Sequence, residues 1–251
     1  MVTGYEPLDT LKPVGNGIWI VDGPPPSGGG CRFPTRATVV RLEDGGLWVH
    51  SPTPLTPGLR AELAALGPVA HLVAPNHWHV RWMPEWAAAS PEATVWAVPG
   101  AALPGARELK GTCAEPAWAS EMEQIIPRGH RWFREAVFYH KPSATLIVTD
   151  LFQAVETAKL PALCRPAVWL TGVDDSDGKM PLRLRLGFRG KDALAEDIET
   201  IIGWAPRRMI LSHGRCYERG AVAELERAFR RVLSAGRWDR ALAAQKAADR
   251  R

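Results

Sequence analysis

The chain has 251 residues, of which 46% are hydrophobic and 23% charged, with a formal net charge of +4 at pH 7. This is an ordinary composition for a globular protein, and the length suits one α/β domain of good size or two small ones. No apolar run approaches the roughly 20 residues that span a bilayer. No stripe of Lys and Arg alternates with aromatic residues, which argues against nucleic-acid binding.

The cysteine usage and the first residues indicate the expected cellular setting. The four cysteines are far apart and include no C-x-x-C pair, which argues against a cysteine zinc knuckle. We expect them to be unpaired, as in a reducing cytosol. The first fifteen residues lack the apolar segment of a signal peptide. The sequence therefore predicts a cytoplasmic protein that acts on a small molecule, with neither a membrane nor a nucleic acid as partner.

The first third of the chain shows clear local signals. Residues 17–22 form a β-rich run, and residues 36–52 contain two such runs around "EDGG", which is typical of a hairpin. Residues 55–68 predict a helix with Thr56 as its N-cap, Pro at its first position and Gly-Pro at its end. A buried strand is expected over residues 69–75.

The remainder predicts a mixture of helices and strands without internal repeats. The expected elements are a short helix over 83–90, strands over 92–98, 134–140, 144–150 and 207–214, a broken helical stretch over 153–172, and helices over 191–204 and 220–235. A basic helix ends the chain, and its solvated face needs no anionic partner. Because no linker separates two regimes of composition, we predict one domain over residues 1–251, with its core at about 14–235.

Five side chains with metal-binding groups follow predicted strands or apolar runs. His77 and His79 come after the strand 69–75, His130 follows the apolar pair in "IIPRGH", and Asp150 and His213 close two further strands. Loops at the carboxyl ends of strands converge in α/β folds, and zinc favours imidazole nitrogen and carboxylate oxygen. A single histidine at such a position is more often a hydrogen-bonded loop residue. The joint arrangement is what predicts a metal site.

With these motifs the chain resembles the metallo-β-lactamase superfamily. The family motif H-x-H-x-D-H corresponds to "HWHVRW", its "GH" turn to Gly129–His130, its strand-ending aspartate to Asp150, and its last histidine to His213 in "LSHG". The stretches "PVGNGIWIVDGP", "LVAPN" and "SATLIVTDL" are similar to the uncharacterised group called domain of unknown function 4336. The resemblance covers about residues 14–235. It implies a four-layer αββα sandwich with its metal site at one edge of the two sheets.

Two departures from the motif imply a reduced site. Arg81 and Trp82 stand where the family has an aspartate and a histidine for the second metal, and neither side chain can ligate a cation. The resemblance then implies one zinc ion rather than two, held by His77, His79 and His130. Asp150 would be a fourth ligand, and His213 would share a second metal only with Asp150.

Three interpretations of Arg81 stay open. It pairs with Asp150 and fills an emptied metal pocket, or binds a carboxylate or phosphate of a substrate, or is an ordinary surface arginine. Trp82 either forms an apolar wall of the site or packs under the loop.

The resemblance supports two functions of different classes. The first is a metal-dependent hydrolase that activates water at one zinc ion for attack on an ester, lactone, thioester or phosphoester. Asp150 would be its catalytic carboxylate, orienting the water or acting as base. The second is a protein that has lost catalysis and binds a small anionic ligand or a partner in the degenerate pocket.

Overall fold

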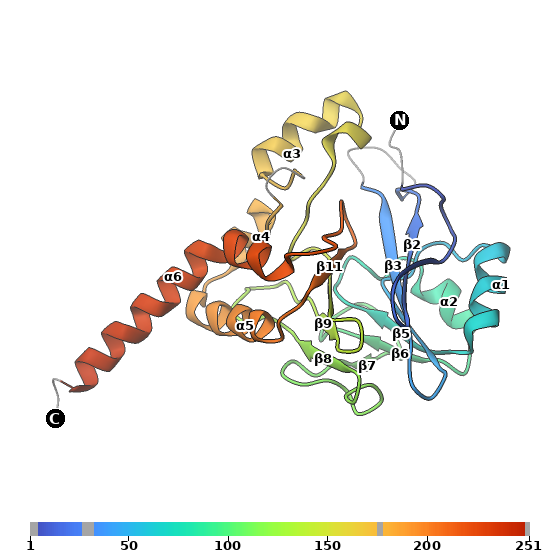
Figure 1. Cartoon of the computed structure of the whole chain (residues 1–251), viewed down its shortest axis with the longest axis horizontal. Coiled ribbons are helices and arrows are strands. Elements are labelled where there is room, and N and C mark those ends of the chain that lie inside the picture. The colour runs from blue at the N-terminus through green and yellow to red at the C-terminus, as the bar shows by residue number, and fades with distance from the viewer. Residues whose placement is uncertain (1–4, 27–32, 175–177, 249–251) are drawn as a thin grey trace.

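The computed structural model describes residues 5–26, 33–174 and 178–248, and within these ranges two mixed β-sheets stack face to face (Figure 1). The first sheet has the strand order β1 (Lys12–Gly15), β2 (Ile18–Gly23), β3 (Thr35–Arg41), β4 (Leu47–His50), β5 (Val69–Ala74), β6 (Thr94–Ala97) and β7 (Arg107–Glu108). The second has the order β11 (Arg208–Leu211), β10 (Thr145–Val148), β9 (Val137–His140) and β8 (Met122–Ile125).

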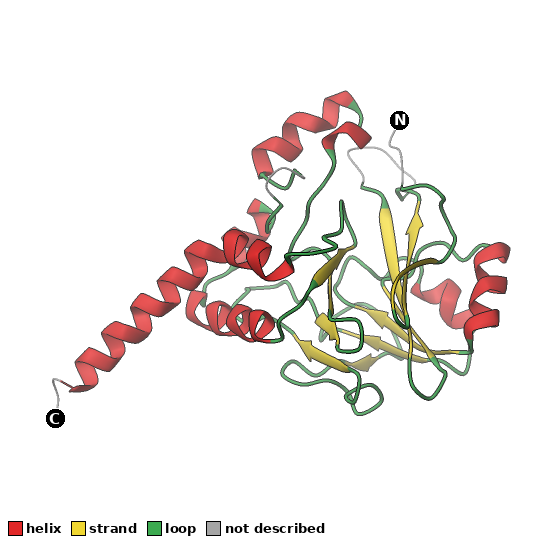
Figure 2. Cartoon of the chain, in the orientation of Figure 1, coloured by secondary structure: helices red, strands yellow, loops and turns green. Residues whose placement is uncertain are grey.

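Helices cover the outer face of each sheet, as Figure 2 shows. The helices are α1 (Pro57–Leu66), α2 (Met83–Ala89), α3 (Arg165–Thr171), α4 (Leu182–Gly187), α5 (Lys191–Gly203) and α6 (Ala221–Ala248), with short 3-10 turns η1 (Thr157–Lys159) and η2 (Ala162–Cys164). Helices α1 and α2 pack on the first sheet, and α5 and α6 pack on the second. The expected α/β fold with two sheets flanked by helices is confirmed.

Three buried clusters hold these layers together, because each sheet is apolar on both faces. In β3, the neighbouring residues Val39 and Val40 point to opposite faces: Val39 packs with the α1–α2 layer, and Val40 packs between the sheets. The inter-sheet cluster includes the fully buried side chains of Trp48, Trp118, Phe138 and Ile147. This packing fixes the two sheets relative to each other, and with them the loops at their shared edge.

Local signals determine helix α1 as the sequence predicted. The Oγ1 of Thr56 accepts a hydrogen bond from the backbone N–H of Leu59 at 3.2 Å, and Pro57 occupies the first turn. The helix ends before Gly67, whose N–H donates to the Leu63 carbonyl. The hairpin of β3 and β4 is also as expected, and its turn contains Gly45 at φ +85°, a conformation that glycine adopts without strain.

Parallel strand pairs bring four loops to one edge of the sandwich. Strands β4 and β5 run parallel in the first sheet, and β10 and β11 run parallel in the second. Their carboxyl ends lead into Ser51, the segment 75–82, Asp150 and His213 respectively. The sheet holds these loop ends in place, so their side chains are brought together by the fold itself.

Several sequence expectations differ from the structure. The stretch 153–172 is helical only in η1, η2 and α3, and the sequence did not predict β8 or α4. Helix α6 runs without a break through the basic tail to Ala248, and its second half projects from the body (Figure 1). The cysteines were expected to be unpaired, and this is wrong for Cys164, which is disulfide-bonded. Among the helices described, none combines the length and the apolar character that a membrane span requires.

Candidate metal centre

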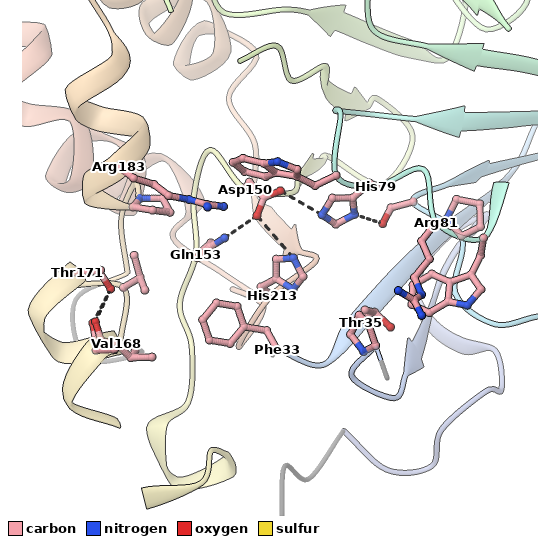
Figure 3. A pocket seen from close by; sticks show the side chains of 18 residues that line it. Phe33, Thr35, His79, Arg81, Asp150, Gln153, Val168, Thr171, Arg183 and His213 are labelled. Carbon is pink, nitrogen blue, oxygen red and sulfur yellow. Dashed lines mark hydrogen bonds and ion pairs between the residues drawn. The ribbon is translucent and has the colours of Figure 1, made fainter. Parts of the chain in front are cut away.

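Three of the five predicted ligand side chains meet at this edge of the sandwich. The Nε2 of His79 lies 3.2 Å from Oδ2 of Asp150, and the Nε2 of His213 lies 3.6 Å from its Oδ1. One ligand atom from each residue lies within 4.8 Å of the other two. Figure 3 shows the two imidazoles directed at the carboxylate from the first and second sheets. These three side chains are the His–Asp–His cluster.

The other nitrogen of each imidazole is held by a neighbour. The Nδ1 of His213 lies 3.0 Å from the carbonyl oxygen of Pro34, and the Nδ1 of His79 lies 2.6 Å from Oγ of Ser51. Ser51 adopts φ +54°, a rare conformation for serine that tends to occur at functional sites. Such partners fix the ring orientation and the tautomer of metal-binding histidines.

This donor set fits a divalent cation. The Pro34 carbonyl can only accept, so Nδ1 of His213 carries the proton, and the neutral ring turns the lone pair of Nε2 toward a carboxylate oxygen. Two acceptors that face each other require a shared proton or a cation. Bonds of 2.0 to 2.2 Å around a tetrahedral zinc place neighbouring ligand atoms about 3.3 to 3.6 Å apart. The two distances to Asp150 are 3.2 and 3.6 Å, close to this range.

The charge state of Asp150 also suits a ligand. Burial by itself raises the pKa of this carboxyl, but the hydrogen bonds from His79 and Asn76 and the electrostatic attraction of both imidazoles hold it well below its usual range. Burial lowers the pKa of His213 against the opposing effect of Asp150. The cluster therefore presents an anionic carboxylate between imidazoles, the form in which these groups bind zinc.

Asn76 connects the two loops that carry His79 and Asp150. Its Nδ2 donates to Oδ2 of Asp150 at 2.9 Å and to Oγ1 of Thr149 at 3.0 Å. Its Oδ1 accepts from the backbone N–H of Trp78 at 2.8 Å and of His79 at 3.1 Å. The side chain is fully buried. Asn76 is therefore a positioning residue that sets the turn bearing His79 relative to Asp150.

Glu135 holds the loop of Asp150 through hydrogen bonds to its backbone. Its two carboxylate oxygens accept the backbone N–H groups of Thr149 at 2.8 Å, Asp150 at 2.8 Å and Leu151 at 3.0 Å. Burial and the charge of Asp150 raise the pKa of Glu135 to about 7, against the lowering effect of these N–H groups. Gln153 completes the support, because its Nε2 donates to Oδ1 of Asp150 at 2.6 Å. None of the four supporting residues Ser51, Asn76, Glu135 and Gln153 was predicted from the sequence.

His77 points away from the cluster. The Asn76-capped turn separates the two histidines of the H-x-H motif, so that His77 lies beside Phe133 at 6.5 Å between ring centroids and faces Gly100. Its Nδ1 is buried and has no hydrogen-bond partner among the described residues. Burial, with the charge of Arg134, lowers its pKa. The expectation that all five ligand side chains meet at one point is therefore not met.

His130 is engaged elsewhere through both ring nitrogens. Its Nδ1 accepts from the backbone N–H of Phe133 at 2.8 Å, so its Nε2 carries the proton and faces the Leu184 carbonyl at 3.1 Å. The ring packs against Phe188, and a Cβ at Gly187 would collide with it. Burial is the main influence that lowers the pKa of His130. This neutral histidine joins its loop to α4 and lies outside the His–Asp–His cluster.

Arg81 and Trp82, the two predicted substrate-binding residues, both line the cavity beside the cluster. The guanidinium of Arg81 lies 5.6 Å from the ring centroid of Trp82. Figure 3 places Arg81 on the far side of His79 from Asp150, whose ion pairs are with the two histidines. The partly buried ring of Trp82 packs against the α1–α2 layer and presents an apolar surface to the cavity.

The cavity in front of the cluster has a volume of about 580 Å³. This is within the range of pockets that bind small molecules. Its floor holds His79, Asp150 and His213, and its walls come from the first sheet on one side and from α3 and α4 on the other. Such a cavity gives a small molecule direct access to the open side of the cluster.

The sequence of the chain matches one protein family. Residues 18–180 match the family described as Domain of unknown function (DUF4336). That range is well over half of the 251 residues. A comparison with curated proteins found no match.

Comparison with solved structures shows the fold. The DIM-1 metallo-β-lactamase, in a structure exposed to ceftazidime, has a TM-score of 0.61 at 13% identity, over 90% of this chain and 96% of that one. TMB-1 has a TM-score of 0.59 at 14% identity, over 90% and 97%. A metallo-β-lactamase from Erythrobacter litoralis in its mono-zinc form has a TM-score of 0.54 at 15% identity, over 91% and 96%. The architecture is the metallo-β-lactamase fold.

Proposed function

Because the chain belongs to the DUF4336 family and has the metallo-β-lactamase fold, we propose that it is a metal-dependent hydrolase with one zinc ion at His79, Asp150 and His213. One observation carries the proposal. Two imidazoles and a carboxylate from three different strand ends face one another across the floor of a cavity, and the outer nitrogen of each ring is held by a neighbour. Three protein ligands and an open position are typical of catalytic zinc sites.

When bound, a zinc ion supplies Lewis-acid activation of a water molecule and of the bond to be cleaved. The residues of the chain orient the ligand side chains and hold them in place. Ser51 and Pro34 orient the two rings, while Asn76 and Gln153 hold the two oxygens of Asp150. These contacts preserve the geometry of the ligands while substrate and product exchange, which is the usual task of outer-shell partners. The reaction class is hydrolysis of an ester, lactone, thioester or phosphoester.

A second function has its own supporting observation. His77 and His130 lie outside the cluster, and Arg81 and Trp82 occupy motif positions of the second metal, so the site offers fewer ligands than a two-metal centre requires. A protein that has lost catalysis and binds a small anionic ligand in the same cavity is consistent with this reduction. The reduced set is equally sufficient for one catalytic zinc ion, and the intact supports around it favour the hydrolase.

Metal analysis of protein purified without added zinc tests the proposal. We expect about one equivalent of zinc, lost on chelation, and zinc-dependent hydrolysis in a screen of esters, lactones, thioesters and phosphodiesters. His79→Ala removes a ligand and is expected to abolish both metal binding and activity. His77→Ala is the matched control from the same motif and should retain the metal. Absence of metal from the unaltered protein, or equal metal loss in both variants, would contradict the proposal.

A further inference from the structure

The cavity that the His–Asp–His cluster faces is apolar over most of its walls. Apolar side chains contribute to it from the first sheet and the loops of its strands, and also from the segment that contains α3 and α4; they include Phe33, Trp78, Trp82, Val168, Val173 and Pro181. Polar groups also line the cavity. They are the cluster itself, Gln153, which is bonded to Asp150, the hydroxyl residues Thr35, Ser51 and Thr171, and two arginines, Arg81 and Arg183. A ligand that fills this space must carry an apolar body, because the walls offer little to replace the water of a polar one.

Of the two arginines that line the cavity, Arg183 is the one that stacks more closely on an aromatic ring at its wall. Arg183 belongs to α4, is exposed, and places its guanidinium 4.1 Å from the ring centroid of Trp78. No carboxylate of the described part of the chain lies within ion-pair distance of Arg183. Figure 3 shows Arg183 and Arg81 on opposite sides of the cluster, so the two arginines border the cavity from different layers of the fold.

The stack on Trp78 prepares Arg183 to bind an anion. A guanidinium that lies on an indole face is restricted in its rotamers, and its edge N–H groups stay free to donate in the plane of the ring. A planar carboxylate matches this edge with two parallel hydrogen bonds. Trp78 is itself 37% exposed at the cavity, so the stacked pair is accessible to a ligand.

Asp150 restricts the charge that the cavity accepts. Its carboxylate lies in the floor of the cavity, where Asn76 and Gln153 donate hydrogen bonds to its two oxygens. In the metal-free protein, a dianion or a polyphosphate would place several charges near this carboxylate with few donors to compensate them. A ligand with a single carboxylate that binds to Arg183, away from Asp150, avoids this repulsion.

We propose that the cavity binds an amphipathic monocarboxylate, with its carboxylate on Arg183 and its apolar body against Phe33, Trp82 and Val168. The inference rests on the proposed function where it names a substrate class. If the protein is a hydrolase, the bond that is cleaved belongs to the part of the ligand that lies next to the His–Asp–His cluster. The binding itself requires no metal. The anion subsite on Arg183 and Trp78 therefore has a readout that is independent of catalysis.

Calorimetric titration of metal-free protein tests the subsite. The ligands are 4-phenylbutanoate and its uncharged amide, which differ in charge at nearly constant shape. We expect the acid to bind at least about tenfold more tightly than the amide, as a charge-assisted bidentate contact implies. Arg183→Gln should remove this preference and leave amide binding unchanged. Arg185→Gln is the matched control, because Arg185 is exposed on the same helix and does not line the cavity.

The outcomes separate this inference from the hydrolase proposal. Equal affinity for acid and amide, no binding of either, or equal effects of the two substitutions would overturn the subsite. Tighter, Arg183-dependent binding of 3-phenylpropyl phosphate would overturn the choice of a monocarboxylate. Arg183-dependent acid binding by a protein that takes up no zinc would support the subsite and refute the hydrolase. Zinc uptake without acid binding would refute the subsite alone.

Discussion

Replacement of Asn76 by alanine tests whether its hydrogen bonds position His79 and Asp150 for metal binding. Its amide makes five hydrogen bonds of 2.8 to 3.3 Å, to Asp150, Thr149, Glu135 and the backbone of Trp78 and His79. The side chain is fully buried, so each of these partners loses its bond in a place that water does not reach freely. Asn76→Ala therefore acts on both loops of the cluster at once.

The size of the effect follows from these contacts. A buried group left without a partner costs about 1 to 3 kcal/mol, and the largest costs concern charged groups such as Asp150. Because a water molecule can occupy the vacated space and restore some bonds, we expect a net destabilisation of about 3 kcal/mol rather than the full sum. The loss of orientation at His79 and Asp150 should weaken zinc binding by about 10- to 100-fold.

Two assays measure these effects. Urea unfolding of the metal-free protein gives the change in the free energy of unfolding, and titration against a competing chelator gives the zinc affinity. Asn16 is the other asparagine of the chain; it is exposed in the β1–β2 turn, so Asn16→Ala provides the control. A change below about 1 kcal/mol for Asn76→Ala, or one no larger than that of Asn16→Ala, would refute the reasoning.

Two further predictions concern backbone geometry and pH. Gly214 has φ +103°, and a Cβ there would collide with the carbonyl of Ala154, so Gly214→Ala should lower the free energy of unfolding by more than about 3 kcal/mol. Gly203→Ala in open space near the end of α5 should change it by less than about 1 kcal/mol, and equal effects in thermal unfolding would contradict this account. Burial lowers the pKa of His140 to about 4, below that of the unfolded chain, so its contribution to stability is full above about pH 6.5 and falls as the pH drops toward 4. Between pH 7 and 5 the unaltered protein should lose about 1 kcal/mol more than His140→Gln, and parallel pH profiles of unfolding would disprove the assignment.

The elements that the sequence predicted well are those with local signals. Helix α1 has its own cap and stop, and the β3–β4 hairpin has its own turn, so neither depends on distant residues. Strand β8 and helix α4 are different. The "LRLRLG" of α4 alternates with a period of two and forms less than two helical turns, and tertiary contacts such as the packing of Leu184 in the core determine it.

The ligand residues that directly follow a strand could be predicted from the sequence. Asp150 and His213 directly follow β10 and β11, and the parallel pairing of these strands brings the two side chains to one edge. The direction of each histidine in "HWH" was not predictable, because it depends on a turn that the side chain of Asn76 closes. The position of His130 depends on a carbonyl 54 residues further along the chain, at Leu184.

Residues without a motif of their own were beyond sequence reasoning. Glu135 is the second residue of a predicted strand and has no spacing that relates it to Asp150, yet it accepts the backbone N–H of that residue. Asn76 offered the only usable signal, since an amide directly before H-x-H at a strand end is well placed to cap the turn. Conversely, the pairing of Arg183 with Trp78 joins α4 to the H-x-H loop across about a hundred residues, which only the fold reveals.

A crystal structure of the zinc-loaded protein, with an anomalous map recorded at the zinc edge, tests the central claim most directly. The account predicts one peak, within about 2.2 Å of Nε2 of His79, Nε2 of His213 and the carboxylate of Asp150. A peak between His77 and His130, or none at the His–Asp–His cluster of a protein that contains zinc, would contradict it.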